Sequence, residues 1–328
     1  MSSNVLITFS VSIFAAMLSL SLFIIIIIMI RNYMQGGKYK KSTLIDGKIV
    51  IITGANTGIG KETAIDLAKR GGKIYIACRN EKRGQNAQME IIEKSSNMNV
   101  HFLQLDLASM DSIRKFSRKF HELESQLHIL INNAGVMACP KSYTKDGFEM
   151  HMGVNHLGHF LLTNLLLDIL KNTPNSRIVN VSSLFHIVGF IWKSNFFGEK
   201  FYFRWHAYAT SKLANILFTR ELAKRLKSSN TTANSLHPGA VHSNLQRHVS
   251  SVIKILTTPF QWILFKDTLA GAQTTIFLSV DPSLDKVTGK YFSDCRQCSP
   301  LFTAKNDVLA KWLWEKSEEL TGLAVKEI

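Results

Sequence analysis

The chain of 328 residues contains few cysteines, with only four in its whole length. So few cysteines cannot build the disulfide framework of a small secreted domain, and this favours a reducing compartment. Cys295 and Cys298 form the single C-x2-C sequence, and no second cysteine or histidine pair at suitable spacing completes a zinc site. We therefore expect no metal. No internal repeat is visible, which excludes a solenoid.

Acidic residues are also scarce, with 24 Asp and Glu against 39 Lys and Arg and a formal net charge of +15. The basic residues are spread along the chain without a nucleic-acid-binding motif, so we expect no nucleic acid as a partner. A basic domain held beside an anionic membrane surface explains the excess better. Solvated surface charge is the alternative explanation.

Charge is absent altogether from residues 5–30. As a helix this run would be roughly 39 Å long, against about 30 Å for a bilayer's hydrocarbon core. It predicts a tilted, single-pass transmembrane helix. A cleavable signal peptide is the alternative, but its apolar core is normally about 7 to 15 residues, and no small-x-small site follows Ile30. Because basic residues follow the run and none precede it, the remainder of the chain is expected in the cytosol.

Short β-branched runs then alternate with amphipathic helical patterns. The predicted strands are 48–53, 73–78, 100–105, 128–132, 177–181 and 232–236. The main helical patterns are 62–70, 81–95, 109–123 and 148–171. They predict an α/β fold with a doubly wound parallel sheet of Rossmann type. Residues 1–41 form the expected anchor and basic linker, and residues 42–328 form a single catalytic domain.

A glycine-rich turn, TGANTGIG at 53–60, follows the first predicted strand. Its glycines allow a sharp turn that brings backbone N–H groups and the next helix N-terminus against a pyrophosphate. The G-x3-G-x-G spacing departs from the commoner G-x-G-x-x-G, so the general dinucleotide fingerprint does not apply directly. An ordinary structural turn is the alternative. The predicted cofactor contacts are Gly54, Ala55, Asn56, Thr57, Gly58, Ile59 and Gly60.

Arg79 follows the second predicted strand, where NAD-specific sites commonly carry an acidic residue. An arginine suits a 2′-phosphate and therefore favours NADP(H), although Lys82 or Arg83 could take this role and leave Arg79 a surface residue. Asp106 is suited either to accept a hydrogen bond from an adenine amino group or to cap the next helix. Predicted contacts after the third and fourth strands are Asp106, Leu107, Asn133, Ala134 and Gly135.

Tyr208 and Lys212 are spaced so that both side chains project from one helix face. A phenol with a pKa near 10 is a poor base at neutral pH, and a nearby ammonium with an oxidised nicotinamide would lower that pKa. Such a phenol could transfer a proton in step with a hydride. Tyr-x3-Lys alone occurs by chance in many helices.

These motifs together resemble the short-chain dehydrogenase/reductase family in order and approximate spacing. The matching positions are 53–60, 132–135, Ser183, Tyr208, Lys212 and 238–239, and the resemblance covers residues 42 to 328. The apolar N-terminus, the Cys78-Arg79 pair and the sequence VNHLGHF at 154–160 are similar to the membrane-bound retinol dehydrogenase branch. That branch is generally NADP(H)-dependent. The resemblance implies interconversion of a retinoid, or a similar apolar aldehyde or ketone, and its alcohol.

The resemblance also implies residue roles. Tyr208 would donate or accept the proton, and Lys212 would lower its pKa and hold the nicotinamide ribose. Ser183 would bind the substrate oxygen, with Ser182 as the alternative serine. Asn155 would hold a water that relays protons to Lys212. Cofactor contacts are further implied for Pro238, Gly239, Val241 and Ser243.

Aromatic residues crowd the interval between Ser183 and Tyr208. They are Phe185, Phe190, Trp192, Phe196, Phe197, Phe201, Tyr202, Phe203 and Trp205. We expect them to line the entrance for an apolar substrate. A second apolar stretch, 252–265, stands where a substrate lid is expected. Core packing or membrane contact is the alternative.

Several functional questions stay open in the sequence. A steroid or general lipid-aldehyde reductase is the nearest alternative, and a non-catalytic nucleotide-sensing scaffold is a more distant one. The endoplasmic reticulum is the expected membrane, with a mitochondrial membrane as the alternative. The resemblance allows a homodimer.

Overall fold

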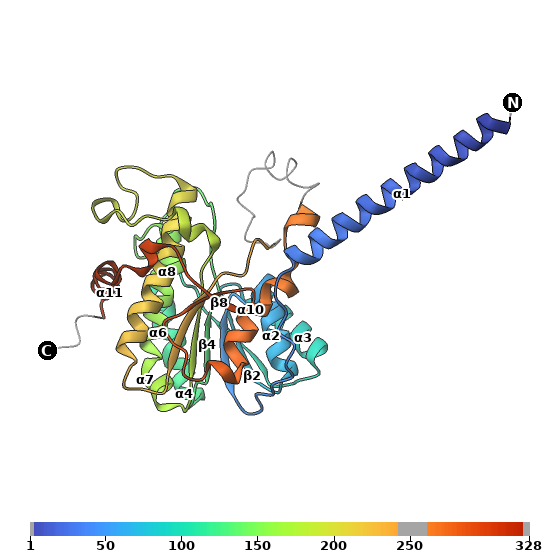
Figure 1. The fold of residues 1–328 in the computed structure, drawn as a ribbon. Coiled ribbons are helices and arrows are strands. Elements are labelled where there is room, and N and C mark those ends of the chain that lie inside the picture. Colours follow the sequence, from blue (N-terminus) through green and yellow to red (C-terminus); the bar gives the residue numbers. More distant parts are fainter. Residues whose placement is uncertain (1–2, 242–260, 324–328) are drawn as a thin grey trace.

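A computed structural model describes residues 3–241 and 261–323. Within these ranges, one eight-stranded sheet lies between two layers of helices (Figure 1). The strands are β1 (Ile49–Thr53), β2 (Lys73–Cys78), β3 (Val100–Gln104), β4 (Ile129–Asn132), β5 (Arg177–Val181), β6 (Thr232–Leu236), β7 (Tyr291–Ser293) and β8 (Arg296–Cys298). Their order is β3-β2-β1-β4-β5-β6-β7-β8, parallel as far as β7 and antiparallel at β8. The prediction of a doubly wound, mostly parallel sheet is confirmed.

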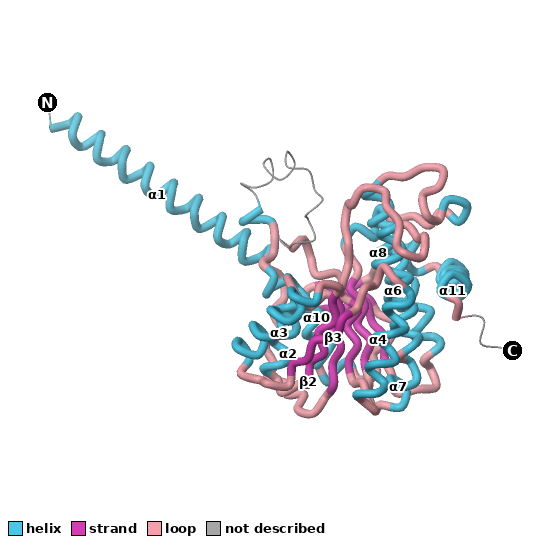
Figure 2. Tube along the Cα trace, turned by 180° about the vertical axis from the view of Figure 1, so that it is seen from behind, coloured by secondary structure: helices cyan, strands magenta, loops and turns pink. Residues whose placement is uncertain are grey.

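Helices cover both faces of this sheet (Figure 2). On one face lie α2 (Gly58–Lys69), α3 (Glu81–Ser95) and α10 (Thr268–Val280). On the other face lie α4 (Met110–Leu123), α5 (Met150–Met152), α6 (Gly158–Leu165), α7 (Leu167–Asn172) and α8 (Arg204–Arg225), with α11 (Asp307–Thr321) packed on α8. Alternate strand residues supply two hydrophobic cores: Ile51 faces the α4 and α8 layer, whereas Val50 and Ile52 face the α2 layer.

The predicted helix 148–171 is not continuous. A π-helical turn, η1 (Gly153–Leu157), separates α5 from α6, and α7 begins after a further break. Gly158 packs so tightly on the turn between β3 and α4 that a Cβ there would lie 2.7 Å from the Leu107 carbonyl oxygen. Apolar periodicity does not distinguish a π turn from an α-helix. The structure also adds β7 and β8, which are too short to show a strand pattern.

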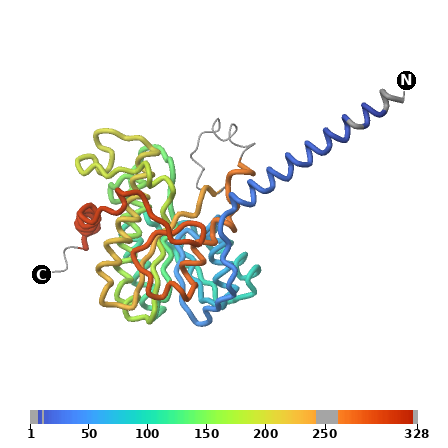
Figure 3. The backbone as a smooth tube through the Cα atoms, viewed as in Figure 1, coloured from blue at the N-terminus to red at the C-terminus, as the bar shows by residue number. Residues whose placement is uncertain are grey.

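The N-terminal helix α1 (Ser3–Met34) projects from the domain (Figure 3). Among the described residues, its 7–34 portion is the one helix long and apolar enough to cross a membrane, which is consistent with a membrane anchor. The end of the helix contacts the segment 261–267. The Arg31 guanidinium lies 4.5 Å from the Trp262 ring centroid, and Gln35 Nε2 donates to the Phe265 carbonyl at 3.3 Å. The end of the helix is thus in direct contact with the domain that contains the sheet.

Candidate active site

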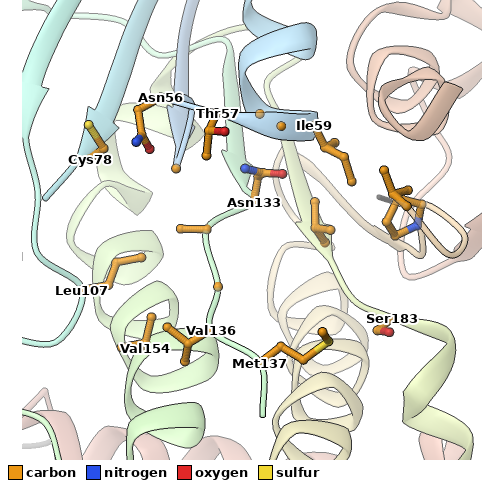
Figure 4. Close-up of a pocket in the computed structure, with 18 of the residues that line it drawn as sticks. Asn56, Thr57, Ile59, Cys78, Leu107, Asn133, Val136, Met137, Val154 and Ser183 are labelled. Carbon is orange, nitrogen blue, oxygen red and sulfur yellow. The ribbon is translucent and has the colours of Figure 1, made fainter. Parts of the chain in front are cut away.

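A cavity of about 920 Å³ lies at the carboxyl ends of the parallel strands (Figure 4). Most residues that the sequence predicts for the site line it: Gly54, Asn56, Thr57, Gly58, Ile59, Gly60, Arg79, Asp106, Leu107, Asn133, Ala134, Gly135, Ser183, Tyr208, Lys212, Pro238, Gly239 and Val241. Ala55 is buried beside the turn, and Asn155 lies outside the cavity wall. Ser243 lies outside the described residues.

The glycine-rich turn at one end of the cavity is fitted to the loop after β4. Gly54 has a φ of +69°, and a Cβ there would lie 2.9 Å from Ala134 Cα. Thr53 Oγ1 accepts hydrogen bonds from the backbone N–H groups of Asn133 and Ala134, both at 2.9 Å. Close backbone packing and the N-terminus of α2 make this end suitable for the pyrophosphate of a dinucleotide.

Two arginines line the cavity beyond β2. Arg79 and Arg83 both lie on its wall, whereas Lys82 does not. Glu90 lines the same region, but its carboxylate accepts from Lys61 Nζ at 2.7 Å and from Lys94 Nζ at 2.8 Å. These bonds, led by the one from Lys61, lower the pKa of Glu90 and keep the carboxylate paired. Both arginines are therefore placed to meet an anionic group.

Asp106 lines the cavity after β3. Its Oδ1 accepts from the Ala108 backbone N–H at 3.0 Å, which orders the turn before α4. The cap of that helix is Ser109, whose Oγ accepts from the Ser112 N–H at 3.3 Å. The capping alternative for Asp106 is therefore wrong, and the carboxylate faces the cavity from an ordered turn.

Tyr208 and Lys212 lie at the other end of the cavity, on α8. Burial raises the pKa of Tyr208 to about 12, although a hydrogen bond with Ser183 acts in the opposite direction. Burial also lowers the pKa of Lys212 to about 8. Lys212 Nζ lies 5.9 Å from the phenol ring centroid and donates to the Val181 carbonyl at 3.1 Å. The protein's own groups therefore keep the phenol protonated at neutral pH, where the sequence led us to expect a lowered pKa.

The two serines after β5 make different contacts. Ser182 is buried, and its hydroxyl donates to the Lys212 carbonyl at 2.7 Å. Ser183 Oγ accepts from the Phe185 N–H at 3.2 Å and forms the hydrogen bond with Tyr208. Ser183 is thus the serine whose hydroxyl lies beside the phenol.

Asn155 lies behind the cavity wall, in the π turn η1. Its Oδ1 accepts from the Val136 N–H at 2.8 Å, and its Nδ2 donates to the Val136 carbonyl at 3.0 Å and to Ser211 Oγ at 2.9 Å. A Cβ at Gly135 would lie 3.1 Å from the same Oδ1. The amide joins the loop after β4 to α8, and the water relay through Asn155 stays a prediction.

Met137, Met150 and Val154 also line the cavity, and the sequence did not assign them to the site. From the predicted apolar segments, Phe185, Trp205 and Phe265 line it. Figure 4 shows Met137 and Ser183 at the opposite end of the cavity from Asn56 and Thr57. Phe190 and Trp192 do not line the cavity and are 59% and 47% exposed. Of the aromatic interval, Phe185 and Trp205 thus line the cavity, and a substrate entrance formed by the other aromatic side chains stays a prediction.

Comparison with known proteins gives a consistent picture. Residues 48–253 match the model of the short chain dehydrogenase family. Mouse retinol dehydrogenase 11 is 50% identical over 296 residues, covering 90% of this chain and 93% of that protein. Human retinol dehydrogenase 12 is 50% identical over 298 residues, covering 90% of this chain and 92% of that protein. A crystal structure of an uncharacterized protein from Mycobacterium paratuberculosis matches with a TM-score of 0.70 and 34% identity, covering 85% of this chain and 95% of that one. The chain belongs to the short-chain dehydrogenase/reductase family and is a retinol dehydrogenase-like oxidoreductase that acts on CH–OH groups.

Proposed function

We propose that this protein is an NADP(H)-dependent enzyme that interconverts a retinoid, or a similar apolar aldehyde or ketone, and its alcohol at a membrane surface. One observation carries the proposal. Ser183, Tyr208 and Lys212 meet at an apolar end of the cavity, and Arg79 and Arg83 line the same cavity beyond β2. The cavity can therefore hold a phosphorylated dinucleotide and an apolar carbonyl compound together.

Three side chains carry the proton chemistry of the proposed reaction. The nicotinamide cofactor supplies or accepts the hydride. In the reducing direction, the protonated phenol of Tyr208 gives its proton to the substrate oxygen, while Ser183 donates a hydrogen bond to the developing charge. The Lys212 ammonium, charged at neutral pH because its pKa is about 8, stabilises the resulting phenolate. The proton lost by Tyr208 is then replaced through the relay proposed for Asn155.

The apolar walls and the similarity to retinol dehydrogenases support a retinoid. Met137, Met150, Val154, Phe185 and Trp205 line the same cavity as Ser183. A long apolar chain enclosed there gains roughly 25 cal/mol for each Å² removed from water. Short polar carbonyl compounds gain little from the same walls.

The cofactor preference rests on the two arginines. Guanidinium groups bind phosphate through paired N–H donors, and the carboxylate in this region, Glu90, is occupied by Lys61 and Lys94. No free carboxylate among the described lining residues beyond β2 opposes a 2′-phosphate at Arg79 and Arg83. This arrangement supports NADP(H) over NAD(H).

The membrane assignment rests on α1. An apolar helix followed by basic residues supports a single-pass anchor with the catalytic domain, residues 42–328, in the cytosol, and the endoplasmic reticulum is the proposed organelle. Protease added to intact microsomes should digest the domain, whereas full protection before detergent would reverse the topology. Fractionation with mitochondria would change the assigned organelle. Light scattering of the solubilised protein tests whether it forms a homodimer.

Product analysis with the detergent-solubilised full chain tests the proposed reaction. We expect reduction of retinal with NADPH at a kcat/KM well above that for a steroid ketone or a medium-chain aldehyde. A higher kcat/KM for either of those compounds would assign the protein to steroid or general lipid-aldehyde reduction. Binding of NADPH without hydride transfer to any of the three would favour the nucleotide-sensing scaffold and reject the proposed function.

A further inference from the structure

A buried polar cluster lies directly behind Tyr208 and has no part in the chemistry described above. Its members are Cys139, Glu149, His151 and Tyr202. His151 has no exposed surface, and Glu149 is 2% exposed. His151 Nδ1 donates to Glu149 Oε1 at 2.7 Å, and His151 Nε2 lies 3.3 Å from Cys139 Sγ. Both ring nitrogens are therefore held by neighbours inside the protein.

The imidazole in this cluster is charged at neutral pH. Burial acts to lower the pKa of His151, but the hydrogen bonds with Cys139 and Glu149 outweigh it and raise the pKa to about 9. The imidazolium is paired directly with the Glu149 carboxylate, so the ion pair carries no net charge. Its effect on a neighbouring group is therefore mainly one of geometry rather than of electric field.

His151 packs directly against the catalytic tyrosine. The His151 and Tyr208 ring centroids are 6.3 Å apart with the planes at 65°, and Phe185 packs against the same phenol with centroids 5.8 Å apart. The phenol ring is thus in edge-to-face contact with two rings. Phe185 is 41% exposed, whereas His151 is fully enclosed and fixed by hydrogen bonds. Of these two ring contacts, the one between Tyr208 and His151 is therefore the fixed one.

The cluster also joins three segments that carry site residues. Cys139 follows the loop after β4, and Tyr202 immediately precedes α8 and donates to the Cys139 carbonyl at 3.2 Å. Glu149 Oε2 accepts from the Met152 N–H at 2.9 Å and caps the helical segment that leads to Asn155. The orientation of the His151 ring is therefore linked to all three of these segments.

We infer that His151 is a positioning residue, whose ring, oriented by Glu149 and Cys139, holds the Tyr208 phenol in the orientation required for proton transfer to the substrate oxygen. The inference rests on the proposed function, because the transferred proton is that of Tyr208. Small displacements of a reacting group reduce rates strongly, by about 100-fold for about 1 Å. A positioning defect therefore appears in the chemical step and leaves cofactor binding intact.

The test compares the double variant His151→Phe, Glu149→Gln with the wild type, using the full chain in detergent. Phenylalanine retains a ring beside Tyr208, and the glutamine avoids leaving a buried carboxylate without a partner. The measurements are NADPH affinity, the single-turnover rate of retinal reduction per NADPH-binding site, and its solvent deuterium isotope effect. We expect a rate at least about tenfold lower, a larger isotope effect and an unchanged NADPH affinity. His151→Gln, which keeps a polar partner for Glu149, should show the same changes if the double variant does not fold.

Tyr75→Phe is the matched control, because it removes a buried tyrosine hydroxyl, bonded to Glu124, that belongs neither to the cluster nor to the cavity wall. Its rate should stay within about threefold of the wild type. A single-turnover rate and isotope effect equal to the wild type in the His151 variants would overturn the inference, as would an equal loss in Tyr75→Phe. If the wild type reduces another carbonyl compound in place of retinal, the substrate proposal fails and the same comparison is made with that compound. A wild type without any hydride transfer would reject both proposals.

Discussion

The two ends of the cavity are built from different kinds of chemical group. At the nucleotide end, backbone groups and absent side chains form the surface: Gly54 and Gly60 leave no room for a Cβ, and Thr53 accepts from two N–H groups of the loop after β4. At the carbonyl end, buried side chains form the surface, with Tyr208 and Lys212 on α8. The first end depends on local conformation and the second on tertiary packing, so substitutions at the two ends should cause different defects.

The largest effect is expected at the carbonyl end, from Tyr208→Phe. The change removes the transferable proton and keeps the ring that packs on His151 and Phe185. Turnover should fall by about 10² to 10⁴ or more, while NADPH affinity and melting temperature stay near those of the wild type. Near-normal turnover in a folded variant would remove Tyr208 from the mechanism.

A pH profile should reveal the second buried group at this end. Because burial disfavours the charged form, the pKa of Lys212 is lowered to about 8, and the ammonium is lost as the pH rises through that value. The Tyr208 proton is retained up to a pH of about 12. Carbonyl reduction should therefore be level from about pH 6 to 8 and then fall by up to about tenfold per pH unit.

Lys212→Arg provides the matched control for this profile. A guanidinium stays charged across the range, so whatever activity remains should lack the decline near pH 8. The same decline in the arginine variant would assign the titration to another group.

At the nucleotide end, the expected defect is in binding rather than in chemistry. Gly54→Ala places a Cβ 2.9 Å from Ala134 Cα at a φ of +69°. NADPH affinity, measured by fluorescence titration, should fall at least about tenfold, which is about 1.4 kcal/mol. Gly47→Ala is the control, because Gly47 has a φ of +71° but no atom within 4 Å of the added Cβ. Equal loss in both variants would attribute the effect to backbone strain and not to the contact with Ala134.

Cofactor choice tests the arginines at the same end. Arg79→Asp should shift the ratio of kcat/KM for NADPH over NADH towards NADH by about tenfold, through lost phosphate pairing and added repulsion. Arg83→Ala should shift the ratio in the same direction by a smaller factor. Lys82→Asp, at a residue outside the cavity wall, should leave the ratio unchanged. A shift confined to Lys82→Asp would move the phosphate site off the two arginines.

The smallest effect concerns substrate length. Replacing Phe185 and Trp205 with alanine removes part of the apolar wall. The ratio of kcat/KM for retinal to kcat/KM for a short aldehyde should therefore fall by about threefold to tenfold. The same change at Phe190 and Trp192, which are exposed, should leave this ratio intact in detergent. A fall of this ratio only in the Phe190 and Trp192 variant would locate substrate recognition on the outer loop.

Elements that depend on local pattern were predictable. All six predicted strands exist within a residue of their expected ends, because a parallel strand buried on both faces reads as a continuous β-branched run. The π turn at Gly153–Leu157 was not predictable, since a π turn keeps the same apolar composition as an α-helix. Strands β7 and β8, with three residues each, are defined by pairing with β6 and with each other.

The sequence by itself determined the glycine-rich turn, the Tyr208 and Lys212 pair on one helix face, and the apolar N-terminal helix. Each depends on residues close together in the chain, where spacing fixes geometry. Tertiary structure alone decided that burial raises the pKa of Tyr208, that Arg83 joins Arg79 in the cavity wall, and that His151 lies against the phenol. Those properties arise from segments distant in sequence, because desolvation and side-chain contact exist only after the chain has packed.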